Sequence, residues 1–218
     1  ALRRISELGA THVWYTGVIR HATTTDYSAY GIPRQHPAVV KGNAGSPYAI
    51  TDYYDIDPDL AVNVEKRMQE FESLVKRTHD AGLKIIIDFV PNHVARQYKS
   101  IARPKGVKDF GEDDDTGKQF DPMNNFYYCP GAAFDPETDL HHGEEKPYEE
   151  FPAKATGNDC FGNRPGRNDW YETVKLNYGV DYCDAGGVST HFSPIPDTWK
   201  KMRDILLFWA GKGVDGFR

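Results

Sequence analysis

Three polar side chains follow a hydrophobic run in the sequence GLKIIIDFVPNHV, residues 82–94. The run ends in Asp88, and Asn92 and His93 come within the next five positions. A carboxylate, an amide and an imidazole supply charge and hydrogen-bonding groups, whereas a strand that only filled a core would end in a plain turn. We therefore expect a functional site where this segment ends.

The segments around these residues alternate between helix and strand. Residues 2–8 carry apolar side chains at helical spacing, and residues 11–18 (THVWYTGV) are β-branched and aromatic, which predicts a helix followed by a strand. Residues 64–75 form an apolar stripe with intervals of three and four, which predicts a second helix that ends at Gly82. KIIIDFV, residues 84–90, shows no alternation, so we expect a strand buried on both faces in a parallel sheet.

A third helix and strand are predicted near the end of the sequence. Asp197 is the expected N-cap of the helix, and Gly211 ends it. Its apolar face consists of Trp199, Met202, Leu206 and Trp209. GVDGFR, residues 213–218, then begins a strand. Residues 20–60 are expected to form a long loop, and residues 95–196, which are rich in turn residues, acids and aromatics, an irregular region.

This order of elements predicts the relative placement of the polar residues. Strand, helix, strand, long excursion, helix and strand imply right-handed βαβ units around a parallel sheet. In such folds the carboxyl ends of the strands carry the chemistry, because loops and side chains of several strands converge there. Asp88, Asn92 and His93 follow one strand at that edge.

Composition excludes several classes of function. The net charge of −6 argues against a nucleic-acid partner, because phosphate binding needs a basic surface. No apolar run approaches the roughly 20 residues of a membrane span. Residues 1–18 lack the pattern of a secretory signal and resemble the interior of a protein, so localisation is not predicted. Cys129, Cys160 and Cys183 match no zinc motif and are expected to be unpaired, with one disulfide as the alternative.

Five segments together resemble the α-amylase family, glycoside hydrolase family 13. DFVPNH (88–93) resembles the family's first signature, and GVDGFR (213–218) the beginning of its second. LGATHVWYTGV (8–18), SPYAITDYYDIDPDL (46–60) and, more weakly, KLNYGVDY (175–182) match the intervening family segments in order. The resemblance implies an α/β fold that is part of a TIM (β/α)8 barrel, about strands 2–4, with an irregular inserted subdomain.

The resemblance also implies three parts and an incomplete active site. Residues 1–94 would form barrel strands 2 and 3, residues 95–196 the inserted domain B, and residues 197–218 helix 3 and the start of strand 4. Retaining glycosidases use a nucleophilic and an acid/base carboxylate about 5 Å apart. The family nucleophile lies two residues beyond the position of Arg218, and the other two catalytic carboxylates lie on later strands. We therefore expect a portion of an α-glucan-active hydrolase that is inert alone and needs the remainder of its barrel.

The family also implies roles for individual residues. Arg218 would keep the nucleophile ionised, and Asp88 would brace Arg218. His93 would donate a hydrogen bond to a glucose hydroxyl, and Tyr48 would stack on the sugar face. Each role has a structural alternative. Asp88 and Arg218 could form a purely structural ion pair, His93 could make a hydrogen bond to backbone groups at the strand end, and Tyr48 could serve loop packing. Ser46 and Pro47 depart from the His-Gly that often precedes the family tyrosine.

Calcium is the one cofactor that the resemblance implies. Asn92 would be a calcium ligand or a link to the inserted domain, but Lys175 stands where the family carries an aspartate. Calcium needs several oxygen ligands, whereas an ammonium only donates. We therefore expect no calcium here, with Lys175 in the cation's place, where it could bridge to Asn92; a bound Ca²⁺ is the alternative. Other calcium or metal candidates are a loop with Asp113, Asp115, Asp121 and Gly117, expected to be solvated, and the segment with His141, His142, Glu144 and Glu145.

Two function classes follow from these residues. The first is a retaining hydrolase or transglycosylase acting on starch and maltodextrin, whose cleft Tyr127, Tyr128, Trp170 and Tyr171 could line if they are not the core of the inserted region. The alternative is a catalytically silent relative that binds sugar or a protein partner. An unrelated barrel enzyme acting on sugar phosphates would want a phosphate-binding glycine loop after its seventh or eighth strand.

Overall fold

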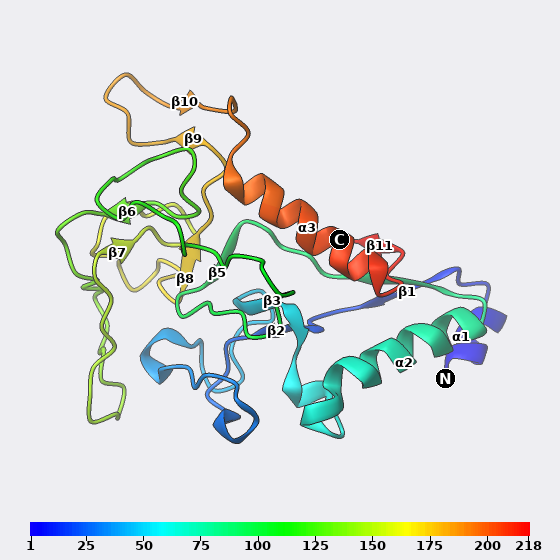
Figure 1. The fold of residues 1–218 in the computed structure, drawn as a ribbon. Helices are drawn as coiled ribbons and strands as arrows, with labels where there is room; N and C mark the ends of the chain where they lie inside the picture. The colour runs from blue at the N-terminus through cyan, green and yellow to red at the C-terminus, as the bar shows by residue number, and fades with distance from the viewer.

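A computed structural model describes residues 1–218 and places three strands in one sheet (Figure 1). β4 (Lys84–Ile87) lies between β1 (His12–Tyr15) and β11 (Gly216–Phe217). Both neighbours run parallel to β4, and Trp14 is opposite Ile86. The parallel sheet predicted from the order of elements is confirmed.

The three helices are α1 (Leu2–Glu7), α2 (Arg67–Asp80) and α3 (Asp197–Gly211). α2 buries Phe71 and Val75, two residues of the predicted apolar stripe. Figure 1 shows the helices together with β1 and β11 in one half of the molecule. Four short 3-10 helices lie between the larger elements: η1 (Ser28–Tyr30), η2 (Pro37–Val39), η3 (Pro58–Leu60) and η4 (Val64–Lys66).

Two details predicted for α3 are wrong. Asp197 is the first helical residue rather than the N-cap, which is Pro196. The Asp197 carboxylate instead accepts a hydrogen bond from Asn125 (3.1 Å) and pairs with Lys201 (3.1 Å), so it joins the helix to the irregular region. Trp199 of the predicted apolar face is 47% exposed, because its indole nitrogen donates to the carbonyl of Tyr178 at the surface (3.0 Å). The buried face of the helix consists of Thr198, Met202, Ile205 and Trp209.

The predicted long loop over residues 20–60 contains two strands. β2 (Ile19–His21) pairs antiparallel with β3 (Ile50–Ile56), and every residue of β3 is buried, including Asp52 and Asp55. Arg20 neutralises both carboxylates, with Nη2 3.0 Å from Asp52 and Nε 3.4 Å from Asp55. A strand that buries paired charges has neither the alternating nor the continuous apolar pattern that predicts a strand.

The segment that follows β4 contains six short strands, all paired antiparallel in twos. β5 (His93–Ala95) pairs with β8 (Thr173–Lys175), β6 (Tyr128–Cys129) with β7 (Ala153–Lys154), and β9 (Val180–Asp181) with β10 (Ser189–Thr190). These pairs lie together in the other half of the molecule in Figure 1. The three cysteines are free, as predicted.

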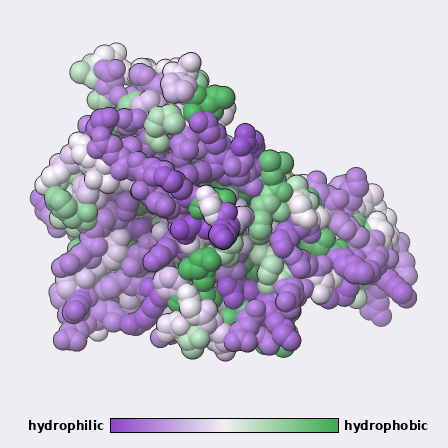
Figure 2. Space-filling view, viewed as in Figure 1, coloured by the Kyte–Doolittle hydropathy of each residue, from purple (hydrophilic) through white to green (hydrophobic).

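One hydrophobic core of 20 buried residues joins the two halves. It includes Ile85 and Ile87 of β4, Val174 of β8 and Trp209 of α3. The core therefore crosses the predicted boundaries after residues 94 and 196, and the division into three parts remains a prediction. The face in Figure 2 is mainly hydrophilic, with a hydrophobic stretch along the line of α3. None of the helices is long and apolar enough to cross a membrane.

Candidate functional site

Asp88 lies directly after β4, buried at the carboxyl edge of the parallel sheet. Its Oδ1 accepts a hydrogen bond from Trp14 Nε1 at 2.9 Å, and its Oδ2 one from the backbone nitrogen of Gly17 at 3.4 Å. The donors come from β1 and the residues just after it, because the carboxyl ends of β1 and β4 lie side by side. This buried carboxylate is thus held by its two neighbours on the adjacent strand.

Arg218 lies beside Asp88, as predicted. Backbone hydrogen bonds from Phe89 to Arg218 (2.8 Å) and from Arg218 to Ile87 (3.0 Å) continue the pairing of β4 and β11. Nη1 of Arg218 is 3.7 Å from Asp88 Oδ1, and the Arg218 guanidinium lies 4.1 Å from the centre of the Trp14 ring. The guanidinium is 62% exposed, so the charge is free to approach a further anion at this edge.

Trp14 is the residue that sequence reasoning missed. It touches both members of the predicted pair: it donates to Asp88 and stacks under Arg218. The sequence feature that could have identified Trp14 is its position: it lies in a predicted strand, and that strand was expected to be next to the strand that ends at Asp88. An aromatic ring one residue from the end of that strand stands at the same edge of the sheet.

Tyr48 meets Asp88 across a small cavity of about 10 Å³, which Gly17 and Tyr53 also line. Gly17 has a left-handed φ of 63°, and a Cβ there would lie 3.0 Å from Cβ of Pro47. Pro47 stands in place of one of the two family residues, His-Gly, that precede this tyrosine. It lies against the turn at Gly17, whose backbone nitrogen donates to Asp88. Tyr48 itself is only partly buried.

His93 faces a different hollow. The ring is 5% exposed and packs against Trp170 with ring centres 4.4 Å apart. Burial lowers its pKa to about 4, and the charge of Lys175 acts in the same direction, although a hydrogen bond to the backbone carbonyl of Tyr48 opposes the shift. His93 is therefore neutral at pH 7, and its Nε2 has no hydrogen-bond partner.

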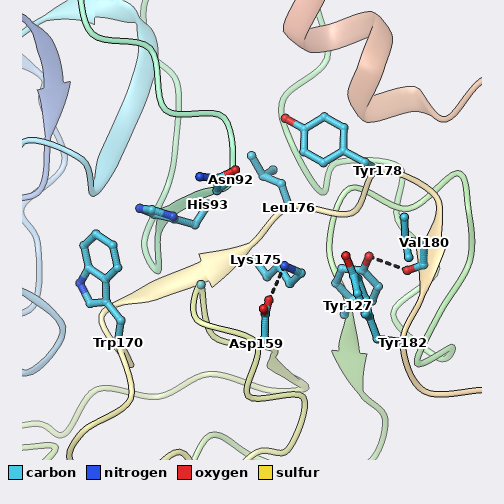
Figure 3. A pocket seen from close by; sticks show the side chains of 11 residues that line it. Asn92, His93, Tyr127, Asp159, Trp170, Lys175, Leu176, Tyr178, Val180 and Tyr182 are labelled. Carbon is cyan, nitrogen blue, oxygen red and sulfur yellow. Dashed lines mark hydrogen bonds and ion pairs between the residues drawn. The ribbon is translucent and has the colours of Figure 1, made fainter. Parts of the chain in front are cut away.

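This hollow is a cavity of about 460 Å³ between β5, β8 and the loops around them (Figure 3). Its walls include Asn92, His93, Tyr127, Asp159, Trp170 and Lys175. The structure therefore groups Asp88, Arg218 and Tyr48 on one side and His93 with Asn92 on another. The backbone of Tyr48 connects the two groups through its contact with His93.

The predicted bridge from Lys175 to Asn92 is wrong. The Lys175 ammonium pairs with Asp159 and lies 5.2 Å from the centre of the Tyr182 ring, because the turn after Thr156 brings a carboxylate closer than the exposed Asn92 amide. Asn92 instead accepts a backbone hydrogen bond from Leu176 (3.1 Å). One amide and one carboxylate that is already paired do not fit a cation that needs six to eight oxygens.

The remaining candidates are held by other partners. Lys118 lies 2.8 Å from Asp121 and 3.3 Å from Asp115, and Asp113 pairs with Lys108 (2.5 Å). No group of three or more His, Cys, Asp or Glu side chains is arranged to hold a metal ion, and this includes the segment 141–145. Of the four aromatics, Tyr127 and Trp170 line the cavity, Tyr128 belongs to the main core, and Tyr171 packs against a second cluster.

Comparisons with known proteins agree on one family. The model of the α-amylase catalytic domain matches residues 1–218. An α-glucosidase of Apis mellifera is 27% identical over 172 residues, which is 78% of this chain and 24% of that protein. The amino acid transporter heavy chain SLC3A1 of Rattus norvegicus is 45% identical over 172 residues, 78% of this chain and 20% of that protein. The chain thus spans at most about a quarter of these relatives.

A solved structure shows the same fold. The α-amylase from Lactobacillus plantarum superimposes with a TM-score of 0.53 and 21% sequence identity. The superposition covers 100% of this chain and 32% of that one.

Proposed function

Because the chain belongs to the α-amylase family, we propose that it forms part of the sugar-binding site of a retaining glycoside hydrolase acting on α-glucans. In this proposal the three parallel strands are strands 2–4 of a (β/α)8 barrel. Residues 95–196 are the domain inserted after the third strand, and residues 197–218 return to the barrel. Starch and maltodextrin are the substrate class, and the remaining barrel strands are the chain's partner.

The observation that carries this proposal is the group of Asp88, Trp14 and Arg218 at one edge of the sheet. An exposed guanidinium braced by a buried carboxylate favours the ionised form of any further carboxylate placed beside it. A retaining mechanism needs such a carboxylate as its nucleophile. We propose that neither Asp88 nor any other acid of this chain serves as nucleophile or general acid, so the chain alone binds sugar without cleaving it.

The proposed sugar contacts follow from the two neighbouring hollows. The free Nε2 of the neutral His93 imidazole would accept a hydrogen bond from a sugar hydroxyl rather than donate one, because Nδ1 carries the proton that is donated to the Tyr48 carbonyl. The ring of Tyr48, which is partly exposed next to Asp88, would cover the apolar face of a sugar unit beside Asp88 and Arg218.

Titration calorimetry with maltose tests the proposal. We expect the chain to bind maltose, and Tyr48→Ala to weaken binding by about tenfold, equivalent to roughly 1.4 kcal/mol. Tyr30→Ala, a change of an exposed tyrosine outside both hollows, should leave the affinity unchanged. A glucose-release assay on the same samples should detect no hydrolysis. Equal loss in both variants, or release of glucose, would contradict the proposal.

The identity to a transporter heavy chain supports a second candidate, a catalytically silent relative. In that case the edge of the sheet would bind sugar or a protein partner without taking part in catalysis. Where the coding sequence continues past Arg218, the second residue after Arg218 separates the candidates. Aspartate there supports the hydrolase, and any other residue supports the silent relative.

A further inference from the structure

His21 in β2 contacts both ends of the turn that carries Tyr48. Its backbone is paired with Ile50, the first residue of β3, and its ring Nε2 lies 3.1 Å from the carbonyl oxygen of Ala44. Tyr48 lies between these two points of contact. A single residue of β2 therefore closes the segment from Ala44 to Ile50.

The turn lies closely against the end of β2. Gly45 has a left-handed φ of 71°, and a Cβ there would lie 1.7 Å from the carbonyl oxygen of Ala22 and 3.5 Å from Cδ2 of His21. The backbone nitrogen of Ala22 donates to the carbonyl of Ala49 at 2.9 Å. Glycine at position 45 thus permits the close approach that brings the Ala44 carbonyl to the ring.

Both ring nitrogens of His21 face oxygen atoms that only accept hydrogen bonds. Nδ1 is 2.7 Å from Oδ2 of Asp57, which follows β3, and Nε2 faces the Ala44 carbonyl. The contact at Nδ1 is close but is not directed as in an ideal hydrogen bond, so it depends on opposite charge. An unprotonated nitrogen would bring its lone pair against an oxygen lone pair at either position. Both contacts are therefore attractive only when each ring nitrogen carries a proton.

Two carboxylates favour the charged form of this ring. Burial lowers the pKa of His21, but Asp57, the Ala44 carbonyl and the charge of Asp59 together outweigh burial and raise the pKa. Arg20, the neighbouring cation in β2, is paired with two other carboxylates of β3. The ring therefore keeps both protons to a higher pH than an ordinary histidine.

We propose that His21 is a positioning residue for the proposed sugar site, because its doubly protonated ring ties Asp57 to Ala44 and so holds the turn that presents Tyr48. This role rests on the sugar contact of Tyr48 proposed above. When the ring loses one proton to solvent, the remaining proton stays at Nδ1, because the carboxylate of Asp57 is the stronger acceptor. Nε2 then faces the Ala44 carbonyl with a lone pair, and the turn is released at that end.

Titration calorimetry with maltose between pH 6 and pH 9 tests this role. The affinity of wild type should be constant below about pH 6.5. It should be about fivefold weaker once the pH exceeds the raised pKa of His21, as expected for the loss of one hydrogen bond. His21→Gln places an amide donor near the position of Nε2 and does not titrate, so its affinity should not change over this range. His21→Leu supplies no donor and should bind weakly at every pH.

His79→Gln is the matched control. His79 also pairs with an aspartate, since its Nε2 is 2.8 Å from Oδ2 of Asp215. This pair lies at the amino end of the parallel strands, where Asp215 also accepts a hydrogen bond from the backbone nitrogen of Ile85 at 2.9 Å. The maltose affinity of this variant should follow the same pH profile as that of wild type.

Solvent exchange of the Ala49 amide, measured by NMR, reports on the turn in the absence of sugar. This amide donates to the carbonyl of Ser46 at 2.9 Å inside the turn. Its protection, relative to an unstructured amide at the same pH, should fall in wild type above the pKa of His21 and stay constant in His21→Gln.

The two measurements separate failure of this role from failure of the proposed function. If wild type binds maltose with the same affinity from pH 6 to pH 9, the positioning role of His21 is overturned and the proposed function stands. If wild type binds no maltose at any pH while the protection of Ala49 still falls, the proposed function is overturned, and His21 only holds the turn.

Discussion

At the scale of single residues, two histidines experience opposite environments. Burial lowers the pKa of His93 to about 4. Burial also opposes the charged form of His21, but the hydrogen bond and charge of Asp57, whose Oδ2 is 2.7 Å from His21 Nδ1, outweigh it and raise the pKa. His93 is therefore neutral at pH 7, whereas His21 keeps its proton to a higher pH than an unperturbed histidine.

This difference predicts opposite effects of pH on stability. Unfolded histidine titrates near 6.5, so between pH 6.5 and 4 the unfolded chain binds a proton at position 93 that the folded chain does not. The contribution of His93 to the free energy of unfolding should fall by about 2 kcal/mol from pH 7 to pH 5. His21 makes its full contribution to the free energy of unfolding below pH 6.5. This contribution is lost as the pH rises through the raised pKa of His21.

Urea unfolding at pH 5 and pH 7 measures the first effect. His93→Gln should remove about 2 kcal/mol of the wild-type difference between the two pH values, whereas His12→Gln, at an exposed position, should not. Nitrogen-15 spectra of the imidazoles should show His93 neutral and His21 protonated at pH 6.5. A protonated His93 at that pH would contradict the assignment.

Single residues also mark how far the sequence alone could lead. Asp88 was identified because the carboxyl ends of parallel strands meet at one edge of a sheet, and Arg218 was identified from the resemblance to the α-amylase family; the structure places them 3.7 Å apart. Trp14 was not identified, because its role depends on the exact direction of a side chain, which spacing does not determine. Lys175 was singled out, but its partner Asp159 lies 16 positions away in a region without periodicity.

At the scale of elements, the strand pair β2–β3 depends on buried charge. Asp52 accepts hydrogen bonds from Arg20 (3.0 Å), from the backbone of Tyr54 (2.9 Å) and Ile101 (2.7 Å), and from Ser100 Oγ (2.6 Å). It thereby joins β3 to the loop after β5. The helices could be predicted from their apolar periodicity and the central strand from its continuous apolar run, whereas these charged strands could not.

Loss of a buried arginine should lower the free energy of unfolding more than loss of a surface arginine. Arg20→Met removes the partner of Asp52 and one partner of Asp55, so we expect a loss of about 3 kcal/mol in the free energy of unfolding. Arg203→Met removes a surface pair with Asp204, whose two side chains are 66% and 48% exposed, and should cost about 0–1 kcal/mol. Equal costs in urea unfolding would show that the buried network does not stabilise the strand pair.

At the scale of the whole molecule, the parallel sheet has two open edges. β1 and β11 each pair only with β4, so the outer hydrogen-bonding groups of both strands have no strand partner. Several large apolar side chains are exposed on α3 and just before it: Phe192, Ile195, Trp199 and Leu207. Open edges and apolar faces favour association with further strands or with other copies.

We therefore expect the 24.6 kDa chain alone to self-associate. Sedimentation velocity over a range of concentrations should show species heavier than the monomer, with their fraction increasing with concentration. Leu207→Lys places a charge on the exposed face of α3, where the side chain is 62% exposed, and should increase the monomer fraction. Leu8→Lys changes a leucine that is 87% exposed at the end of α1 and should not. If the wild-type chain sediments as a single monomeric species at every concentration, these edges need no partner, and the remainder of a barrel is not required to cover them.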